Sequence, residues 1–235
     1  IINIKITMPF ELNKFLKKNL IILIIFFISF ITNIVNINYS IKKFDRTFNY
    51  SDGDNYHGII RTPPEIYIWK KANEFKNNFS LDNLQSYEYR YHFLPPKILA
   101  LSSITFNIKF FDENDFDTKN IRFHFIFQTL IYLLSVVYLY NRLNKINVEN
   151  KVKYLTVTFL FFDPTINQFH PTIFGETIFF ALIITLIGFL IKLPKNNINY
   201  FILGILISII YLQRSVAMLL ILASILVIIL KFKFN

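Results

Sequence analysis

The sequence predicts an all-α protein, a polytopic bundle of about six transmembrane helices in which a long first outer loop carries interfacial helices. The composition is the first indication, because 54% of residues are hydrophobic and 17% are charged, against about a quarter charged in soluble domains. The second is a series of apolar runs that approach the roughly 20 residues needed to cross a bilayer. The third is the placing of lysine and arginine in alternate connections between those runs. The chain begins with Ile and ends directly after an apolar run, so we expect residues 1–235 to be a single transmembrane domain from an incomplete reading frame.

Six segments carry the apolar runs that we expect to be spans. They are residues 20–37, 122–141, 153–169, 172–191, 199–212 and 215–230. The first run follows the basic stretch "NKFLKKN" and precedes no small-residue cleavage site, which predicts an uncleaved signal anchor. Residues 98–108 are apolar but too short to cross a bilayer, which favours an interfacial or re-entrant helix.

The basic residues predict the orientation of these spans, because lysine and arginine in short loops favour the cytoplasm. With a cytoplasmic N-terminus, the cytoplasmic side holds Lys5, Lys14, Lys17, Lys18, Arg142, Lys145, Lys151, Lys153, Lys192, Lys195, Lys231 and Lys233. Outside residues 39–121, only Arg122 and Arg214 fall on the other face. Residues 39–121 contain eleven basic and eleven acidic residues, so the net charge of +10 belongs to the rest of the chain. The basic excess is therefore an orientation signal, and nucleic acid is rejected as a partner.

The first outer loop, residues 39–121, is too long for a plain connector. Its two Pro-Pro pairs, at 63–64 and 95–96, each predict the end of one element and the first turn of the next. After the first pair, apolar residues recur at helical spacing from Ile66 to Phe79, and charged residues fill the other face. This pattern predicts a helix in the membrane interface, with Trp69 at the level of the headgroups.

The stretch "NYSDGDNYHGII" (49–60) places Asp52, Asp54, Tyr56 and His57 close together just after the first span. An ordinary solvated turn is one interpretation, because Asp-Gly is a common turn dipeptide. A functional pair of carboxylates at the membrane surface is the other. Paired carboxylates also suit a hard divalent cation, so a metal stays open as a cofactor, although no third ligand stands at a fixed spacing. The chain has no cysteine, which excludes disulfides and thiolate metal sites.

The stretch "YEYRYHFLPPK" (87–97) brings Arg90 and His92 together among aromatic residues. Its two interpretations are a basic and aromatic interface belt, and a pocket for a lipid-borne phosphate. Both stay open.

Three ionisable residues, Asp163, His170 and Glu176, lie at the outer ends of the third and fourth apolar runs and in the turn that joins them. Carboxylates at or within a bilayer mark function by default, whereas a carboxylate at a helix start is also favoured by the helix dipole. His170 alone is more typical of a satisfied interfacial residue, and Pro164 and a second proline at 171 should break the helices here. Arg214 lies in the turn between the last two runs and needs an anionic partner, either Glu176 or a phosphate from the membrane.

Taken together, these pieces resemble the polyprenyl-phosphate-sugar-dependent glycosyltransferases of the C superfamily, especially bacterial relatives of dolichyl-phosphate-mannose protein mannosyltransferases. Four features carry the resemblance: the Asp-x-Tyr at residues 54–56, "YRYHFLPPKIL", "DPTINQFHPTIFGETIFF" and "LGILISIIYLQRS". They extend over residues 14–233, roughly the N-terminal half of a typical member. Gly175 stands where serine is more usual, and Ser215 where proline often follows the arginine.

The resemblance implies transfer of a sugar from a polyprenyl-phosphate donor to an acceptor hydroxyl, with inversion at the anomeric carbon. It implies Asp54 as the general base with Asp52 as a substitute, and Glu176 as the second outer acid. Arg214, with Arg90 as a further candidate, would neutralise the phosphate leaving group. The remaining substrate-binding candidates are Tyr56, His57, His92, His170 and Asp163. The resemblance also implies a cell-envelope enzyme of the bacterial inner (plasma) membrane, with its active face on the periplasmic side and membrane lipids around it. Protein, lipid and glycan acceptors all stay open.

Three other classes compete with this interpretation. A transporter or lipid flippase would be expected to show internal repeats and binding groups near the bilayer midplane, whereas no repeat is seen here and the acidic residues gather at one face. A non-catalytic assembly subunit would keep the fold without the reaction. A membrane-embedded ligase or polymerase of surface polysaccharide is the nearest enzymatic alternative.

Overall fold

The computed structural model describes residues 10–43, 47–49, 55–57, 63–78, 94–108, 118–146, 148–173, 175–191, 196–214, 219, 222–226 and 229. Within these residues the protein is helical, apart from one pair of short strands. The elements are α1 (Phe10–Lys43), β1 (Thr47–Asn49), β2 (Asn55–His57), α2 (Pro63–Asn78), α3 (Leu94–Phe106), α4 (Thr118–Leu143), α5 (Asn150–Phe162), α6 (Pro164–Asn167), α7 (Glu176–Ile191) and α8 (Asn197–Gln213).

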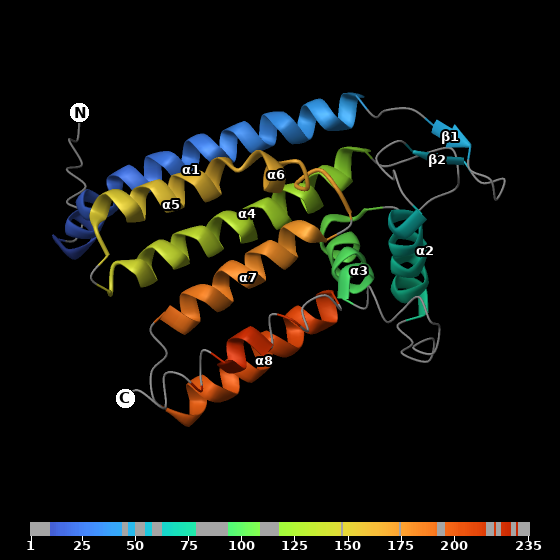
Figure 1. Ribbon diagram of the computed structural model, residues 1–235. Coiled ribbons are helices and arrows are strands. Elements are labelled where there is room, and N and C mark those ends of the chain that lie inside the picture. Colours follow the sequence, from blue (N-terminus) through green and yellow to red (C-terminus); the bar gives the residue numbers. More distant parts are fainter. Residues whose placement is uncertain are drawn as a thin grey trace, which may run out of the picture.

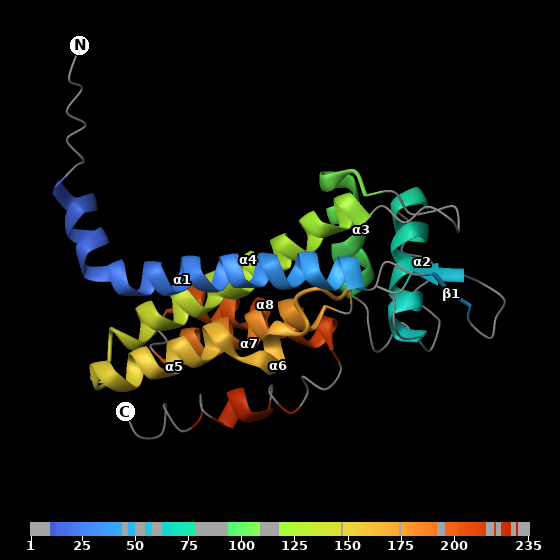
Figure 2. The same cartoon turned by 90° about the horizontal axis from the view of Figure 1, so that it is seen from above.

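Five helices, α1, α4, α5, α7 and α8, lie along a common direction and form the bundle (Figures 1 and 2). The end of α1, the start of α4, the end of α5, the start of α7 and the end of α8 all point to the side where α2 and α3 lie, which we call the α2/α3 end. Two helical segments of the described chain, Asn19–Lys43 and Asn120–Leu143, are long and apolar enough to cross a membrane; α3, α7 and α8 are shorter apolar helices. The predicted helical fold is thus confirmed, and two of the six expected spans have the length and composition of a membrane helix.

The two Pro-Pro pairs start helices as predicted. Pro63 is the first residue of α2, and Pro95 and Pro96 lie in the first turn of α3. Proline is well suited to this position because its fixed φ is helical and its missing N–H has no intrahelical partner there. Both helices cross the direction of the bundle in the two views, so they cap its α2/α3 end (Figures 1 and 2).

Trp69 is buried within the protein. Its exposed fraction is only 6%, and it packs in a buried cluster with Ile37 of α1, Leu99 of α3 and Phe125 of α4. Its place at the level of the headgroups stays a prediction, but its side chain is covered by other helices. The helical period correctly identified an apolar face on α2, and other helices of the protein cover that face. Periodicity alone cannot show whether protein or lipid will cover an apolar face.

A pair of strands within the first loop was not predicted. β1 and β2 are antiparallel, with Thr47 opposite His57, Phe48 opposite Tyr56 and Asn49 opposite Asn55. Three-residue strands are too short to show the alternating pattern by which a strand is recognised in a sequence. The pair lies beyond α2, away from the bundle (Figure 1).

The predicted third span, residues 153–169, is interrupted. α5 ends at Phe162, and Asp163 and Pro164 begin the short helix α6. Asp163 caps α6, because its side chain accepts hydrogen bonds from the backbone N–H groups of Thr165 (2.8 Å) and Ile166 (3.4 Å). The predicted break at Pro164 is therefore confirmed, and the apolar run 153–169 does not form one helix.

Two side chains from other helices satisfy the carbonyl groups left by this break. Leu160 cannot receive the usual helical hydrogen bond four residues on, because Pro164 has no N–H, and the hydroxyl of Tyr132 on α4 donates to its carbonyl at 2.6 Å. The hydroxyl of Ser29 on α1 donates to the carbonyl of Phe161 at 2.7 Å. The end of α5 is thus held by α1 and α4.

Replacing Tyr132 by phenylalanine should lower the free energy of unfolding by about 1–3 kcal/mol, because the partly buried Leu160 carbonyl loses its donor. The measurement is thermal and denaturant unfolding of the detergent-purified protein. Tyr211→Phe is the matched control, since Tyr211 is half exposed at the end of α8 and should tolerate the same change. Equal stability of the two variants would contradict the carbonyl-capping role.

Candidate functional site

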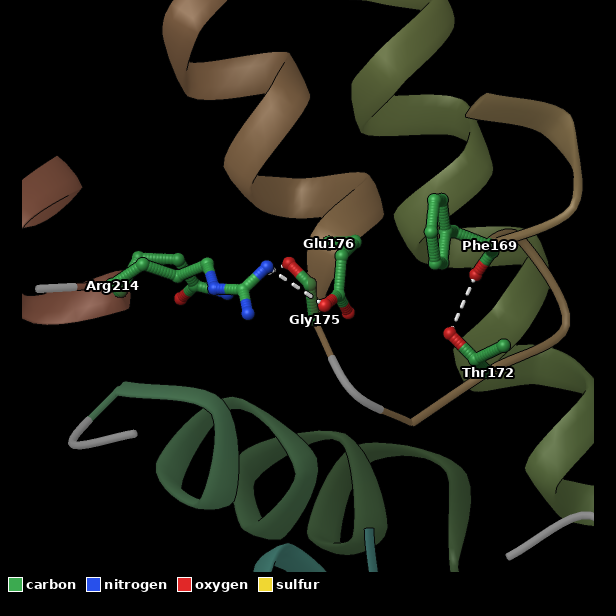
Figure 3. Close-up of polar contacts among 6 residues, drawn as sticks. Phe169, Thr172, Gly175, Glu176 and Arg214 are labelled. Atoms are coloured by element: carbon green, nitrogen blue, oxygen red, sulfur yellow. Dashed lines mark hydrogen bonds and ion pairs between the residues drawn. The ribbon is translucent and has the colours of Figure 1, made fainter. Parts of the chain in front are cut away.

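The centre of the site is an ion pair between the start of α7 and the end of α8. Nη1 of Arg214 lies 2.9 Å from Oε1 of Glu176 (Figure 3). Glu176 is the first residue of α7 and is only 5% exposed, whereas the Arg214 side chain retains 31% exposure. The helix dipole also favours a carboxylate at this position. Of the two anionic partners expected for Arg214, the structure places the carboxylate beside it.

Arg214 reaches Glu176 because α8 ends just before it. Its backbone is extended, and its N–H donates to the carbonyl of Ile210 at 3.2 Å, closing the helix. The guanidinium carbon also lies 6.0 Å from the ring centre of Phe179, one turn along α7, a distance at which a cation is attracted to an aromatic face. The guanidinium is therefore held between a carboxylate and an aromatic ring.

A second contact between α7 and α8 runs through Gly175. The side-chain amide of Gln213 donates to the Gly175 carbonyl at 2.7 Å, and both residues are buried. Gly175 has a φ of +85°, and a Cβ atom built on it would lie 2.5 Å from Nε2 of Gln213. Glycine is thus required here both by the backbone conformation and by the close approach of Gln213.

The chain that leads to Glu176 is held by a buried glutamine. The side-chain amide of Gln128 on α4 donates to the carbonyls of His170 and Thr172, the latter at 2.8 Å. The hydroxyl of Thr172 donates to the carbonyl of Phe169 at 2.8 Å (Figure 3). These bonds fix residues 168–173 in a non-helical path, so α7 begins at Glu176 rather than at the predicted residue 172.

His170 is completely buried in this path and packs against Tyr132, with ring centres 5.3 Å apart. Its Nε2 lies 3.1 Å from Oδ1 of Asn167, whereas its Nδ1 has no hydrogen-bond partner within the described residues. The expectation of a satisfied interfacial histidine is therefore wrong for one of its two nitrogens. Burial lowers the pKa of His170 to about 3, so the ring is neutral at physiological pH.

This histidine should make the protein sensitive to acid. His170 stays neutral in the folded protein, whereas an unfolded histidine takes up a proton below about pH 6.5. Its contribution to stability is therefore complete above that pH and falls as the pH drops toward 3, by about 1.4 kcal/mol per pH unit. Unfolding measured across this window should show a shallower pH dependence for His170→Gln than for the wild type. Because the other titrating groups are present in both chains, identical slopes would contradict the prediction.

Several predicted site residues have no described side chain. Asp52, Asp54, Arg90 and His92 lie outside the residues that the structure describes. Tyr56 and His57 are placed by their backbone only, in β2, which begins at the residue after Asp54 and lies at the α2/α3 end (Figure 1). The Oδ1 atom of Asp163 accepts the hydrogen bonds that cap α6, which is a structural role.

No group of three or more histidine and acidic side chains that could hold a metal ion occurs among the described residues.

Sequence reasoning missed Gln128 and Gln213. Each is a buried amide in an apolar helix, with an exposed fraction of 1% or less. Polar side chains within apolar helices are costly and mark functional or structural contacts, so that rule, applied to amides as well as to charges, could have identified both.

Comparison of the chain with protein-family models, curated proteins and solved structures finds no match.

Proposed function

We propose that the protein is a membrane glycosyltransferase that moves a sugar from a polyprenyl-phosphate donor to an acceptor hydroxyl, with inversion. The observation that carries the proposal is the buried Glu176 paired with the partly exposed Arg214 at the α2/α3 end of the bundle. A guanidinium held at one end of an apolar bundle is suited to bind a phosphate group presented by a lipid.

The same end of the bundle favours a surface reaction. Five long helices alternate in direction, and α2 and α3 cross them at that end (Figures 1 and 2), as interfacial helices would. With the bundle as six spans in a bacterial inner membrane and its N-terminus in the cytoplasm, this end is periplasmic. The lipid carrier cannot leave the membrane, so its phosphate is available at this level.

In this mechanism the acceptor oxygen attacks the anomeric carbon, and the bond from that carbon to the phosphate oxygen breaks. Asp54 accepts the proton of the acceptor hydroxyl, with Asp52 as a substitute. Arg214, with Arg90 as a further donor, stabilises the negative charge on the leaving phosphate, because fixed cations act strongly where charge develops. Glu176 positions the Arg214 guanidinium through the 2.9 Å contact.

The test is sugar transfer in membranes that contain the full-length protein, using a panel of polyprenyl-phosphate sugars. Asp54→Asn should lower transfer by at least about 100-fold, the usual range for loss of a general base, with normal insertion and abundance. Asp52→Asn makes the same change two residues away and is measured beside it, because Asp52 is the alternative base.

The outcomes separate the roles clearly. Loss in Asp54→Asn alone supports Asp54 as the base, and loss in Asp52→Asn alone moves the base to Asp52. No transfer by the wild type from any donor in the panel would contradict the proposal, and a lipid-transport assay would then follow.

A further inference from the structure

A groove with many hydrogen-bonding side chains in its lining runs between α1 and α6. Its volume is about 550 Å³, within the range of roughly 300–1,000 Å³ typical of small-molecule sites. Eight of the eleven described residues that line it carry hydrogen-bonding side chains, among them Asn33, Asn36, Asn167 and Gln168. Its described lining includes neither Glu176 nor Arg214, so it is distinct from the site formed by that ion pair.

The polar residues of α1 lie on one face of the helix. Asn33, Asn36 and Ser40 are spaced three, four and seven residues apart, which brings them to the same side. They belong to the segment Asn19–Lys43, which is apolar and long enough to cross a membrane. Polar side chains in such a helix are costly and indicate a binding or packing role.

Packing explains only part of this polar surface. The Asn33 amide donates to the Ser29 carbonyl at 3.0 Å, and the Asn36 amide donates to the Asn167 carbonyl at 3.3 Å. These contacts join α1 to itself and to α6. Tyr39, by contrast, is 63% exposed, and Gln168 is also exposed, so the groove presents a phenol and an amide to an occupant.

The chemistry of the lining favours a sugar. Amide and hydroxyl groups both donate and accept hydrogen bonds, which matches the hydroxyls of a carbohydrate. The described lining contains no carboxylate, and Lys43 is its only cation. A hydrocarbon chain would cover the exposed Tyr39 hydroxyl and Gln168 amide without offering them hydrogen bonds, at a cost in free energy. The adjoining face of α1 exposes Ile28, Ile31 and Val35, an apolar surface on which the lipid part of the ligand can lie.

We propose that this groove binds the sugar headgroup of a glycolipid, which serves as the acceptor of the transfer reaction. The role as acceptor rests on the proposed function, whereas the binding itself rests on the groove alone. The acceptor hydroxyl is then part of a lipid-linked glycan.

Native mass spectrometry of the full-length protein in detergent tests the binding. The probe is monoglucosyl diacylglycerol, and diacylglycerol with the same chains is the reference. We expect the glucosyl lipid to bind at least about tenfold more tightly, equivalent to about 1.4 kcal/mol. Gln168→Leu and Asn36→Leu should each remove most of that preference. Asn141→Leu, an exposed position in the last turn of α4, should leave it unchanged.

Other results would overturn the proposal. Equal binding of the two lipids would exclude recognition of the sugar. Equal binding of soluble maltose would assign the groove to a free sugar, and preferred binding of a serine-rich peptide would assign it to a protein acceptor. Because Gln168 is exposed, its replacement also keeps the test valid if Asn36→Leu fails to fold.

The binding assay needs no turnover, so the two proposals can fail separately. Asp54→Asn should bind the glucosyl lipid normally while losing transfer. Groove-dependent binding by a protein that transfers no sugar would reject the glycosyltransferase proposal alone. If Gln168→Leu and Asn36→Leu lose the preference for the glucosyl lipid but still transfer sugar normally, the groove is not the acceptor site. The glycosyltransferase proposal would then stand.

Discussion

Arg214→Met should abolish sugar transfer and lower the free energy of unfolding by about 1–3 kcal/mol, the cost of leaving a buried group without its partner. The cost is expected because Glu176 is 5% exposed and would lose the guanidinium that lies 2.9 Å away. Thermal unfolding in detergent measures the stability, and the polyprenyl-phosphate sugar assay measures the transfer.

A double variant separates the two effects of Arg214. Glu176→Gln combined with Arg214→Met removes both charges, so most of the stability should return, while transfer should remain absent. The coupling between the two positions can be measured from the four chains of the double-mutant cycle. Full activity in the stabilised double variant would contradict the phosphate-binding role of Arg214. An unchanged stability in Arg214→Met would contradict the buried pair.

Gly175→Ala should destabilise the protein by about 2–5 kcal/mol. An alanine at a φ of +85° is strained by roughly 1–2 kcal/mol, and its Cβ would lie 2.5 Å from Nε2 of Gln213 and 3.2 Å from Pro95, a contact that adds a cost of about 1–3 kcal/mol. The measurement is again unfolding in detergent. Sugar transfer by the folded fraction of Gly175→Ala would show whether the substitution displaces the neighbouring Glu176.

Gly204→Ala is the matched control, because a Cβ at this position in α8 would meet nothing within 4 Å. There the same substitution should stabilise the helix by about 0.5–1 kcal/mol. In a Gln213→Ala background, the cost of Gly175→Ala should fall toward the strain of the backbone alone. Effects of the same sign at the two glycines would contradict this account.

The sequence predicted those parts of the fold that depend on local chemistry. Pro63 and Pro95 identify helix starts because proline restricts its own backbone wherever it occurs. Pro164 identifies a break for the same reason. The pairing of Arg214 with Glu176 was one of two expected outcomes, since a half-buried arginine needs an anionic partner.

The parts that the sequence did not predict depend on contacts between distant residues. Gln128 contacts residues more than 40 positions away, and Gln213 contacts Gly175 38 positions away. Neither contact leaves a periodic pattern in the chain. Trp69 is covered by protein instead of lipid for a similar reason, because an apolar helical face does not specify which apolar surface will cover it.

The interrupted end of α5 has a consequence for the order in which the helices assemble during synthesis. Tyr132 and Ser29, which satisfy the carbonyls of Leu160 and Phe161, both precede α5 in the chain. In a bilayer, an unsatisfied carbonyl is costly because lipid tails offer no hydrogen bond. During synthesis from the N-terminus, the residues that supply these two donors leave the ribosome before the carbonyls that need them. We therefore expect the end of α5 to be stable only once it packs against both α1 and α4.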